Sequence, residues 1–191
     1  MHFISDLHFG HKNILAYDNR EFPNIEAHDN ALIERWNNKV GVFEDVWILG
    51  DISWYGAEKT IEIFNQLNGN KFLCVGNHDE KLLRNRDVQK LFKEITNYKE
   101  LQLGNGKSIV LSHYPSVCYK NHFYGWYHLY GHVHNSFEYN MVKQFQYQMR
   151  DLYNKQHQMY NVGCMLPYMN YTPRTLEEIV AANDSGSNSN F

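Results

Sequence analysis

Side chains that can bind a metal ion or move a proton recur at five places in this sequence, each after a short apolar run. Such runs are typical of buried strands, and ligands of open α/β sheets bind beyond the carboxyl ends of the strands. We therefore expect the five places to meet at one edge. Carboxylate, amide and imidazole groups without a thiolate favour Mn, Fe or Zn over a soft-ligand metal. The side chains are Asp6, His8, Asp51, Asn77, His78, His113, His132 and His134.

The spacing within two of these motifs supports a shared metal site. One residue separates Asp6 from His8, and one separates His132 from His134. In extended backbone such pairs project to the same side, so each pair could reach one cation. Taken alone, each motif has a plainer interpretation as a polar turn, and Gly50-Asp51 is often only that. Polar turns explain the complete set less well, because all of its members follow apolar runs.

The elements that must position these side chains follow from the apolar periodicity, which indicates an α/β fold. Asn24 is a plausible N-cap, Thr175 begins a capping box, and Asn105-Gly106 is typical of a two-residue hairpin turn. We expect strands at residues 2–4, 46–49, 72–75, 98–103, 107–111, 127–130 and 159–162, and helices at 24–40, 57–67, 80–84 and 175–182.

The composition predicts one globular domain. A chain of 191 residues suffices for one sizeable core, and 43% hydrophobic with 20% charged residues excludes disorder as a class. No apolar run approaches the roughly 20 residues of a membrane span, and the N-terminus lacks a secretory signal pattern. We expect residues 1–182 to form the domain and the low-complexity residues 183–191 to be a disordered tail.

Charge and cysteine content indicate which partners and which cellular compartment to expect. The formal net charge is −3, from 18 basic and 21 acidic residues. This near-neutral charge gives no indication of a basic surface for nucleic-acid or membrane binding. Cys74, Cys118 and Cys164 lack metal-type spacing and cannot all pair, which suits a reducing, cytoplasmic location.

In this order, the motifs resemble those of the calcineurin-like metallophosphoesterase superfamily. They span Asp6 to His134, and the flanks resemble a small single-domain bacterial and phage subfamily, with Ser5–Ile14 at the front and Asn161-Val162-Gly163 and residues 176–179 at the back. The resemblance implies a four-layer α/β/β/α sandwich of two mixed sheets flanked by helices. It also implies two divalent metal ions (Mn, Fe or Zn) at the strand ends.

The family pattern implies a role for each motif residue. The substrate would be a small phosphodiester or phosphomonoester, such as a nucleotide, attacked directly by a metal-bridging hydroxide. His78 would assist the leaving group, although a structural role beside Asn77 is its alternative. The resemblance assigns Asp6, His8, Asp51 and His134 to one metal, and Asp51, Asn77, His113 and His132 to the other.

Residues around the motifs carry weaker expectations. His11, Asn13 and Arg20 are candidates for binding phosphoryl oxygens, although Arg20 could equally cap or pair with Glu21. The aromatic segment Tyr119–Tyr130 could stack a nucleobase, but packing on its own domain is the interpretation we favour.

One departure from two branches of the superfamily lies three residues after Asp51. Trp54 stands where purple acid phosphatases carry a tyrosine ligand and where Ser/Thr protein phosphatases carry an aspartate. A tyrosinate-bound iron is therefore not expected, and the residue that orients His78 is left open.

Two other classes of function are alternatives. A nucleic-acid-processing phosphatase or nuclease is disfavoured by the small size and the lack of a basic stripe. A metal-free scaffold on the same fold is disfavoured because every ligand position and His78 are intact.

Overall fold

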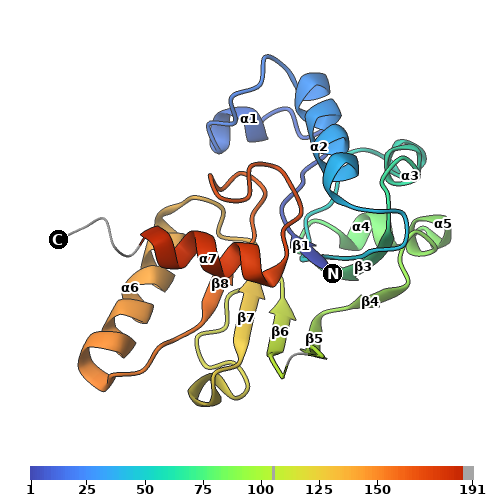
Figure 1. Ribbon diagram of the computed structural model, residues 1–191. Helices are drawn as coiled ribbons and strands as arrows, with labels where there is room; N and C mark the ends of the chain where they lie inside the picture. The colour runs from blue at the N-terminus through green and yellow to red at the C-terminus, as the bar shows by residue number, and fades with distance from the viewer. Residues whose placement is uncertain (105, 187–191) are drawn as a thin grey trace.

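The computed structural model describes residues 1–104 and 106–186, which form two four-stranded sheets with helices on their outer sides. Figure 1 shows α2 to α5 on the side of the first sheet, and α6 and α7 on the side of the second. This arrangement is the predicted α/β/β/α sandwich. The strand orders are β1-β2-β3-β4 and β5-β6-β7-β8.

The first sheet carries three of the five motifs. All three strand pairings in it are parallel, so the carboxyl ends of its strands lie at the same edge of the sheet. The prediction of two mixed sheets differs here in one detail, since only the second sheet is mixed. The strands are β1 (His2–Ile4), β2 (Asp45–Ile48), β3 (Asn70–Cys74) and β4 (Glu94–Thr96), and the helices are α1 (Ile14–Tyr17), α2 (Ile25–Lys39), α3 (Ala57–Phe64), α4 (Glu80–Leu83) and α5 (Arg86–Gln89).

The second sheet carries the other two motifs. β5 and β6 pair antiparallel, whereas β6, β7 and β8 run parallel, so the motifs after β6 and β7 lie at the same edge. The turn expected at Asn105-Gly106 includes Asn105, which lies outside the described residues. The elements are β5 (Tyr98–Gln102), β6 (Ser108–Ser112), β7 (Tyr127–Tyr130), β8 (Met159–Asn161), the 3₁₀ turn η1 (His122–Tyr124), α6 (Phe137–Tyr153) and α7 (Leu176–Gly186).

Backbone hydrogen bonds join the two sheets at the motif edge. The Ser5 amide donates to the Val162 carbonyl at 2.9 Å, and the Cys164 amide donates to the Ser5 carbonyl at 3.0 Å. Ser5 follows β1, whereas Val162 and Cys164 follow β8. The segment that follows β1 in the first sheet is therefore bound directly to the segment that follows β8 in the second sheet.

Helix caps appear where the sequence predicts them. The Asn24 side chain accepts a hydrogen bond from the Ala27 amide at 2.8 Å, and α2 begins at the next residue. Thr175 and Glu178 exchange side-chain to backbone bonds of 2.9 and 3.3 Å, which confirms the capping box. α7 continues to Gly186 and so includes residues 183–186, which the sequence assigned to the tail; residues 187–191 of that tail lie outside the described residues.

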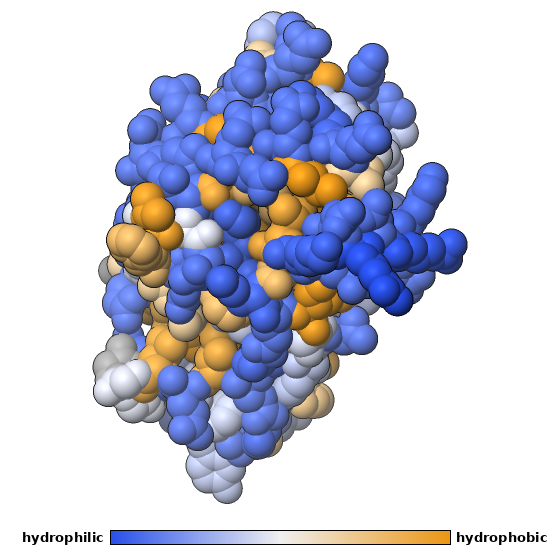
Figure 2. All heavy atoms as spheres, turned by 90° about the vertical axis from the view of Figure 1, so that its right-hand side faces the viewer, coloured by the Kyte–Doolittle hydropathy of each residue, from blue (hydrophilic) through white to orange (hydrophobic). Residues whose placement is uncertain are grey.

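The core and surface follow the expected partition. Trp36 of α2 and Trp47 of β2 are fully buried, and the Trp47 ring stacks on Phe72 of β3 at 5.0 Å. Seen from the side of α3, α5 and β4, the surface is largely hydrophilic, with separate apolar areas between polar side chains (Figure 2). Among the described residues, no helix is both long and apolar enough to cross a membrane.

Candidate metal centre

Four of the predicted ligands gather where β1, β2 and β7 end. One potential ligand atom from each lies within 4.8 Å of the other three. His8 Nε2 is 3.2 Å from His134 Nε2 and 3.8 Å from Asp51 Oδ2. His134 Nε2 is 3.6 Å from Asp6 Oδ1. Two imidazole nitrogens and two carboxylates at these separations form a donor set that suits a divalent cation.

Three further ligands converge beside this group. Asn77 Oδ1 lies 2.9 Å from His113 Nε2 and 3.0 Å from His132 Nδ1. His113 Nε2 is also 3.7 Å from Asp51 Oδ1. Asp51 thus turns Oδ2 toward His8 and Oδ1 toward His113, as a carboxylate shared between two cations would. The structure therefore brings together all seven predicted ligands.

The backbone conformation at these ligands differs from the one that the sequence spacing predicted. Asp6, His8, Asp51, His132 and His134 all have positive φ, from 47° to 69°. The expectation that these motif pairs lie in extended backbone is therefore wrong, although their side chains converge. Left-handed backbone costs an L-residue roughly 1–2 kcal/mol, and such conformations concentrate at functional sites.

Glycines give the ligands the space that they occupy. A Cβ placed on Gly76 would lie 2.4 Å from Asp51 Oδ1, and one placed on Gly131 would lie 2.7 Å from Asp6 Oδ2. Real Cβ atoms do not approach oxygen this closely. These two glycines are therefore needed for close packing around the carboxylates, rather than only for turning the chain.

Hydrogen bonds behind the ligands fix the imidazole orientations. His113 Nδ1 lies 2.7 Å from the Leu49 carbonyl oxygen, so it carries the proton and leaves Nε2 free to bind a cation. His134 Nδ1 lies 2.8 Å from both carboxylate oxygens of Asp18, which directs its Nε2 toward Asp6. Asp18 was not predicted from the sequence, because it lies outside every motif.

Asp79 also has a defined position. Its buried carboxylate accepts hydrogen bonds from the backbone amides of Gly76 at 2.8 Å, Ile52 at 2.9 Å and Asp51 at 3.0 Å. These bonds join the motif after β2 to the motif after β3. Because both oxygens of Asp79 bind backbone, the residue shapes the Asp51 loop rather than orienting the His78 ring.

Burial sets the electrostatics of the centre. It lowers the pKa of His8 well below the usual range and raises the pKa of Asp51. Burial also opposes protonation of His134, but the hydrogen bond that its ring donates to Asp18 and the nearby Asp6 carboxylate leave its pKa raised. A divalent cation would supply the positive charge that the buried carboxylates lack.

His78 lies at the exposed side of the centre. Its backbone amide donates to Asp51 Oδ1 at 3.0 Å, and its ring centroid is 6.2 Å from that of His8. Partial burial lowers the pKa of His78. The ring is tilted against Trp54 at 4.2 Å, and Trp54 stacks on His11 at 4.0 Å with 3° between the planes. Sequence reasoning gave Trp54 no role at the site.

The three predicted phosphoryl-binding residues have different surroundings. The His11 ring stacks on Trp54, which places it beside the centre. Asn13 is exposed at the start of α1. Arg20 is buried, and its guanidinium donates to Asp18 at 2.8 Å and to the Asp6 carbonyl oxygen at 3.0 Å. This geometry favours a supporting role for Arg20 behind the ligands over a substrate contact.

The aromatic segment packs largely on its own domain. Tyr119 is buried, its hydroxyl donates to the Trp126 carbonyl oxygen at 2.7 Å, and its ring contacts His128 at 5.2 Å. Phe123 and Tyr124 are exposed in η1. The buried part of the segment therefore supports β7 rather than lining a binding surface.

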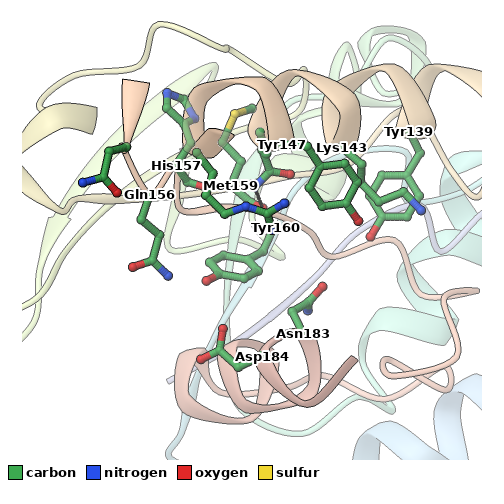
Figure 3. A pocket seen from close by; sticks show the side chains of 12 residues that line it. Tyr139, Lys143, Tyr147, Gln156, His157, Met159, Tyr160, Asn183 and Asp184 are labelled. Atoms are coloured by element: carbon green, nitrogen blue, oxygen red, sulfur yellow. Dashed lines mark hydrogen bonds between the residues drawn. The ribbon is translucent and has the colours of Figure 1, made fainter. Parts of the chain in front are cut away.

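A cavity of about 550 Å³ lies between α6, β8 and α7, away from these ligands (Figure 3). Its two basic side chains already contact aromatic rings: Lys143 lies 4.4 Å from the Tyr139 ring centroid, and Arg150 lies 5.1 Å from that of Tyr147. None of the predicted metal ligands lines it. The cavity is therefore separate from the candidate metal centre.

Known proteins are similar to this chain, some in sequence and one solved structure in fold. The family model described as calcineurin-like phosphoesterase matches residues 2–167. Uncharacterized protein MJ1445 of Methanocaldococcus jannaschii is 32% identical over 190 residues, covering 97% of this chain and 92% of the relative. The Gene 66 protein of Mycobacterium phage L5 is 34% identical over 131 residues, 60% of this chain and 63% of the phage protein. The crystal structure of AQ665 from Aquifex aeolicus, a protein of unknown function, has a TM-score of 0.70 at 25% identity and covers 95% of this chain and 98% of that one.

Proposed function

Because this chain belongs to the calcineurin-like phosphoesterase family, we propose that it hydrolyses a small phosphate ester at a centre of two divalent metal ions. The observation that carries the proposal is the position of Asp51, whose two carboxylate oxygens face different groups of ligands. We assign Asp6, His8, Asp51 and His134 to one cation, and Asp51, Asn77, His113 and His132 to the other.

The donor set fits such cations. The His113 and His134 rings each have Nδ1 engaged by an acceptor, so Nε2 is directed into the centre. With no thiolate present, we propose Mn, Fe or Zn. When bound, two such cations would lower the pKa of a water molecule and neutralise charge on the phosphoryl group.

The chain's own residues carry the remaining steps. His78 donates a proton to the leaving oxygen, since its ring is exposed beside the ligands and its backbone amide is tied to Asp51. Its lowered pKa makes the imidazolium a stronger acid. His11, held by stacking on Trp54, and the exposed Asn13 are proposed to contact the phosphoryl oxygens. Asp18 and Asp79 keep the ligands in place through His134 and the Asp51 loop.

The test is hydrolysis by the Mn-reconstituted protein of p-nitrophenyl phosphate and bis(p-nitrophenyl) phosphate, with metal content measured on the same samples. Asp51→Asn and His132→Ala should lose both bound metal and turnover. His78→Ala should keep its metal while turnover falls roughly 10²–10⁴-fold, the usual contribution of a general acid. Wild-type activity in Asp51→Asn would exclude the dinuclear mechanism, and loss of metal in His78→Ala would show that His78 is structural.

The same preparation separates the substrate classes. A screen of nucleotides, cyclic nucleotides and phosphoprotein distinguishes monoesterase from diesterase activity. Cleavage of single-stranded DNA in preference to all of these would favour a nuclease. A wild-type protein that binds no metal would instead support a scaffold.

A further inference from the structure

A second cavity, of about 540 Å³, opens beside the metal centre on the His78 side. Asn77 and His78 form its inner end, and Trp54 and Tyr55 provide aromatic surface. Residues of α4 also line it, and none of the other six predicted metal ligands does. The cavity therefore adjoins His78, beside which the proposed leaving oxygen would lie.

The outer end of this cavity is basic. Lys81 and Arg84 both line it and are exposed, and neither forms an ion pair with a carboxylate in the described part of the chain. Two exposed lysines elsewhere on the surface are paired, Lys59 with Glu62 at 2.7 Å and Lys90 with Asp87 at 2.7 Å. Two cations that line one cavity without a carboxylate partner can attract an anion.

One acidic residue shares the cavity. Glu80 lines it beside Lys81 and is exposed. With Lys81 and Arg84 the formal charge of these three side chains is +1, so a single added anion is favoured over a polyanion. The apolar surface of Trp54 and Tyr55 suits a flat or ring-shaped carbon skeleton between the two ends.

We propose that this cavity binds the leaving group of the substrate, and that the leaving group is an alcohol or phenol carrying a second anionic group, either phosphate or carboxylate. This rests on the proposed function. In hydrolysis, water adds to phosphorus, the bond to the leaving oxygen breaks, and that oxygen takes a proton from His78. Lys81 and Arg84 then hold the remote anion while Trp54 contacts the skeleton.

A matched pair of substrates tests the assignment. Phenyl phosphate and 4-carboxyphenyl phosphate differ by one carboxylate on the leaving group, and the ratio of their kcat/KM values measures the preference. Lys81→Met and Arg84→Met should each lower this ratio by roughly three- to fivefold, the upper range for an exposed ion pair, and the double variant by about tenfold. Glu80→Gln should raise the ratio, because it removes a like charge.

The control is Arg86→Met. Arg86 is an exposed cation on the neighbouring α5 that does not line the cavity, so its removal changes net charge equally and should leave the ratio unchanged. A ratio that is the same in wild type and the double variant, or that falls equally in Arg86→Met, overturns the proposal.

Binding gives a readout that does not need turnover. Calorimetric titration of benzylphosphonate and 4-(phosphonomethyl)benzoate, which cannot be hydrolysed, should show tighter binding of the carboxylate compound in wild type. That difference should disappear in the Lys81→Met/Arg84→Met variant. If neither ester is hydrolysed but the binding difference exists, the proposed reaction fails and the anion site stands. If both esters are hydrolysed with no difference in binding, the anion site fails alone.

Discussion

The carboxylate of Asp79 accepts a hydrogen bond from the backbone amide of Asp51 at 3.0 Å, so a residue of one motif holds the central ligand of another. The same oxygen accepts from the Gly76 amide at 2.8 Å, and the other accepts from Ile52 at 2.9 Å. Asp51 has positive φ and is buried, and burial raises its pKa. Asp79 therefore stabilises a backbone conformation that the Asp51 side chain needs in order to face both ligand groups.

Replacing Asp79 by asparagine should loosen this loop. The asparagine side chain has the size of the aspartate side chain. Its NH₂ group, however, cannot accept the hydrogen bonds that one carboxylate oxygen now accepts from backbone amides. Leaving buried amides unpaired costs about 1–3 kcal/mol each, so we expect Asp79→Asn to lower the free energy of unfolding by roughly 2–4 kcal/mol. Chemical denaturation of the metal-free protein measures this. Asp87→Asn, on the exposed surface of α5, is the control, and equal stability of the two variants would contradict the assignment.

Asp18 should control metal affinity through His134. Both of its carboxylate oxygens lie 2.8 Å from His134 Nδ1, and this hydrogen bond raises the pKa of the His134 imidazole in the metal-free protein. Asp18→Asn should therefore weaken metal binding by about 10–100-fold, the usual effect of removing a carboxylate behind a histidine ligand. Competition with a chelator gives the affinity. Glu21→Gln alters a nearby exposed carboxylate and should leave affinity unchanged.

Gly76 should be intolerant of any side chain. A Cβ there would lie 2.4 Å from Asp51 Oδ1 and 2.5 Å from the Asp51 backbone nitrogen, so Gly76→Ala must displace the loop. We expect the variant to fold and to lose metal from the centre. Gly104→Ala is the matched control, because a Cβ there has no atom within 4 Å. Metal content after desalting measures both, and full metal occupancy in Gly76→Ala would show that the loop accommodates the methyl group.

The ligands themselves could be predicted from the sequence because each is marked locally, by a polar residue directly after an apolar strand. The parallel strand pairings then bring those strand ends to one edge, as for Asp51 after β2 and Asn77 after β3. The backbone conformation could not be predicted in this way. Positive φ at Asp6 and His134 depends on tertiary hydrogen bonds, such as the one from the Asp6 amide to the Gly50 carbonyl oxygen at 3.1 Å.

The supporting residues were missed for a related reason. Asp18 reaches His134 across 116 residues of sequence, and no local pattern marks either as the other's partner. The helix α6 was also not predicted. Its apolar residues do not all face the core, since Phe137, Met141 and Leu152 are exposed, and this obscures the helical period.

His128 should make the fold sensitive to acid. It is fully buried in β7, its Nδ1 lies 3.1 Å from the Val110 carbonyl oxygen, and its Nε2 accepts from the Ser116 amide at 2.9 Å. Both ring nitrogens are thus satisfied only in the neutral form, and burial lowers the pKa of His128 to about 4. The unfolded chain binds a proton near pH 6.5 while the folded protein does not, so stability is complete above that pH.

As pH falls from about 6.5 to about 4, this histidine alone should remove up to roughly 3 kcal/mol from the free energy of unfolding. Denaturation of the metal-free protein across this range measures the slope, and His128→Gln should flatten it. Because that variant also changes the hydrogen bonds of the buried ring, the imidazole resonance of His128 in the wild-type protein is the second measurement. It should stay at its neutral position down to about pH 5, since protonation would set a ring N–H against the Ser116 amide. A His128 resonance that titrates near pH 6.5 would contradict the burial argument.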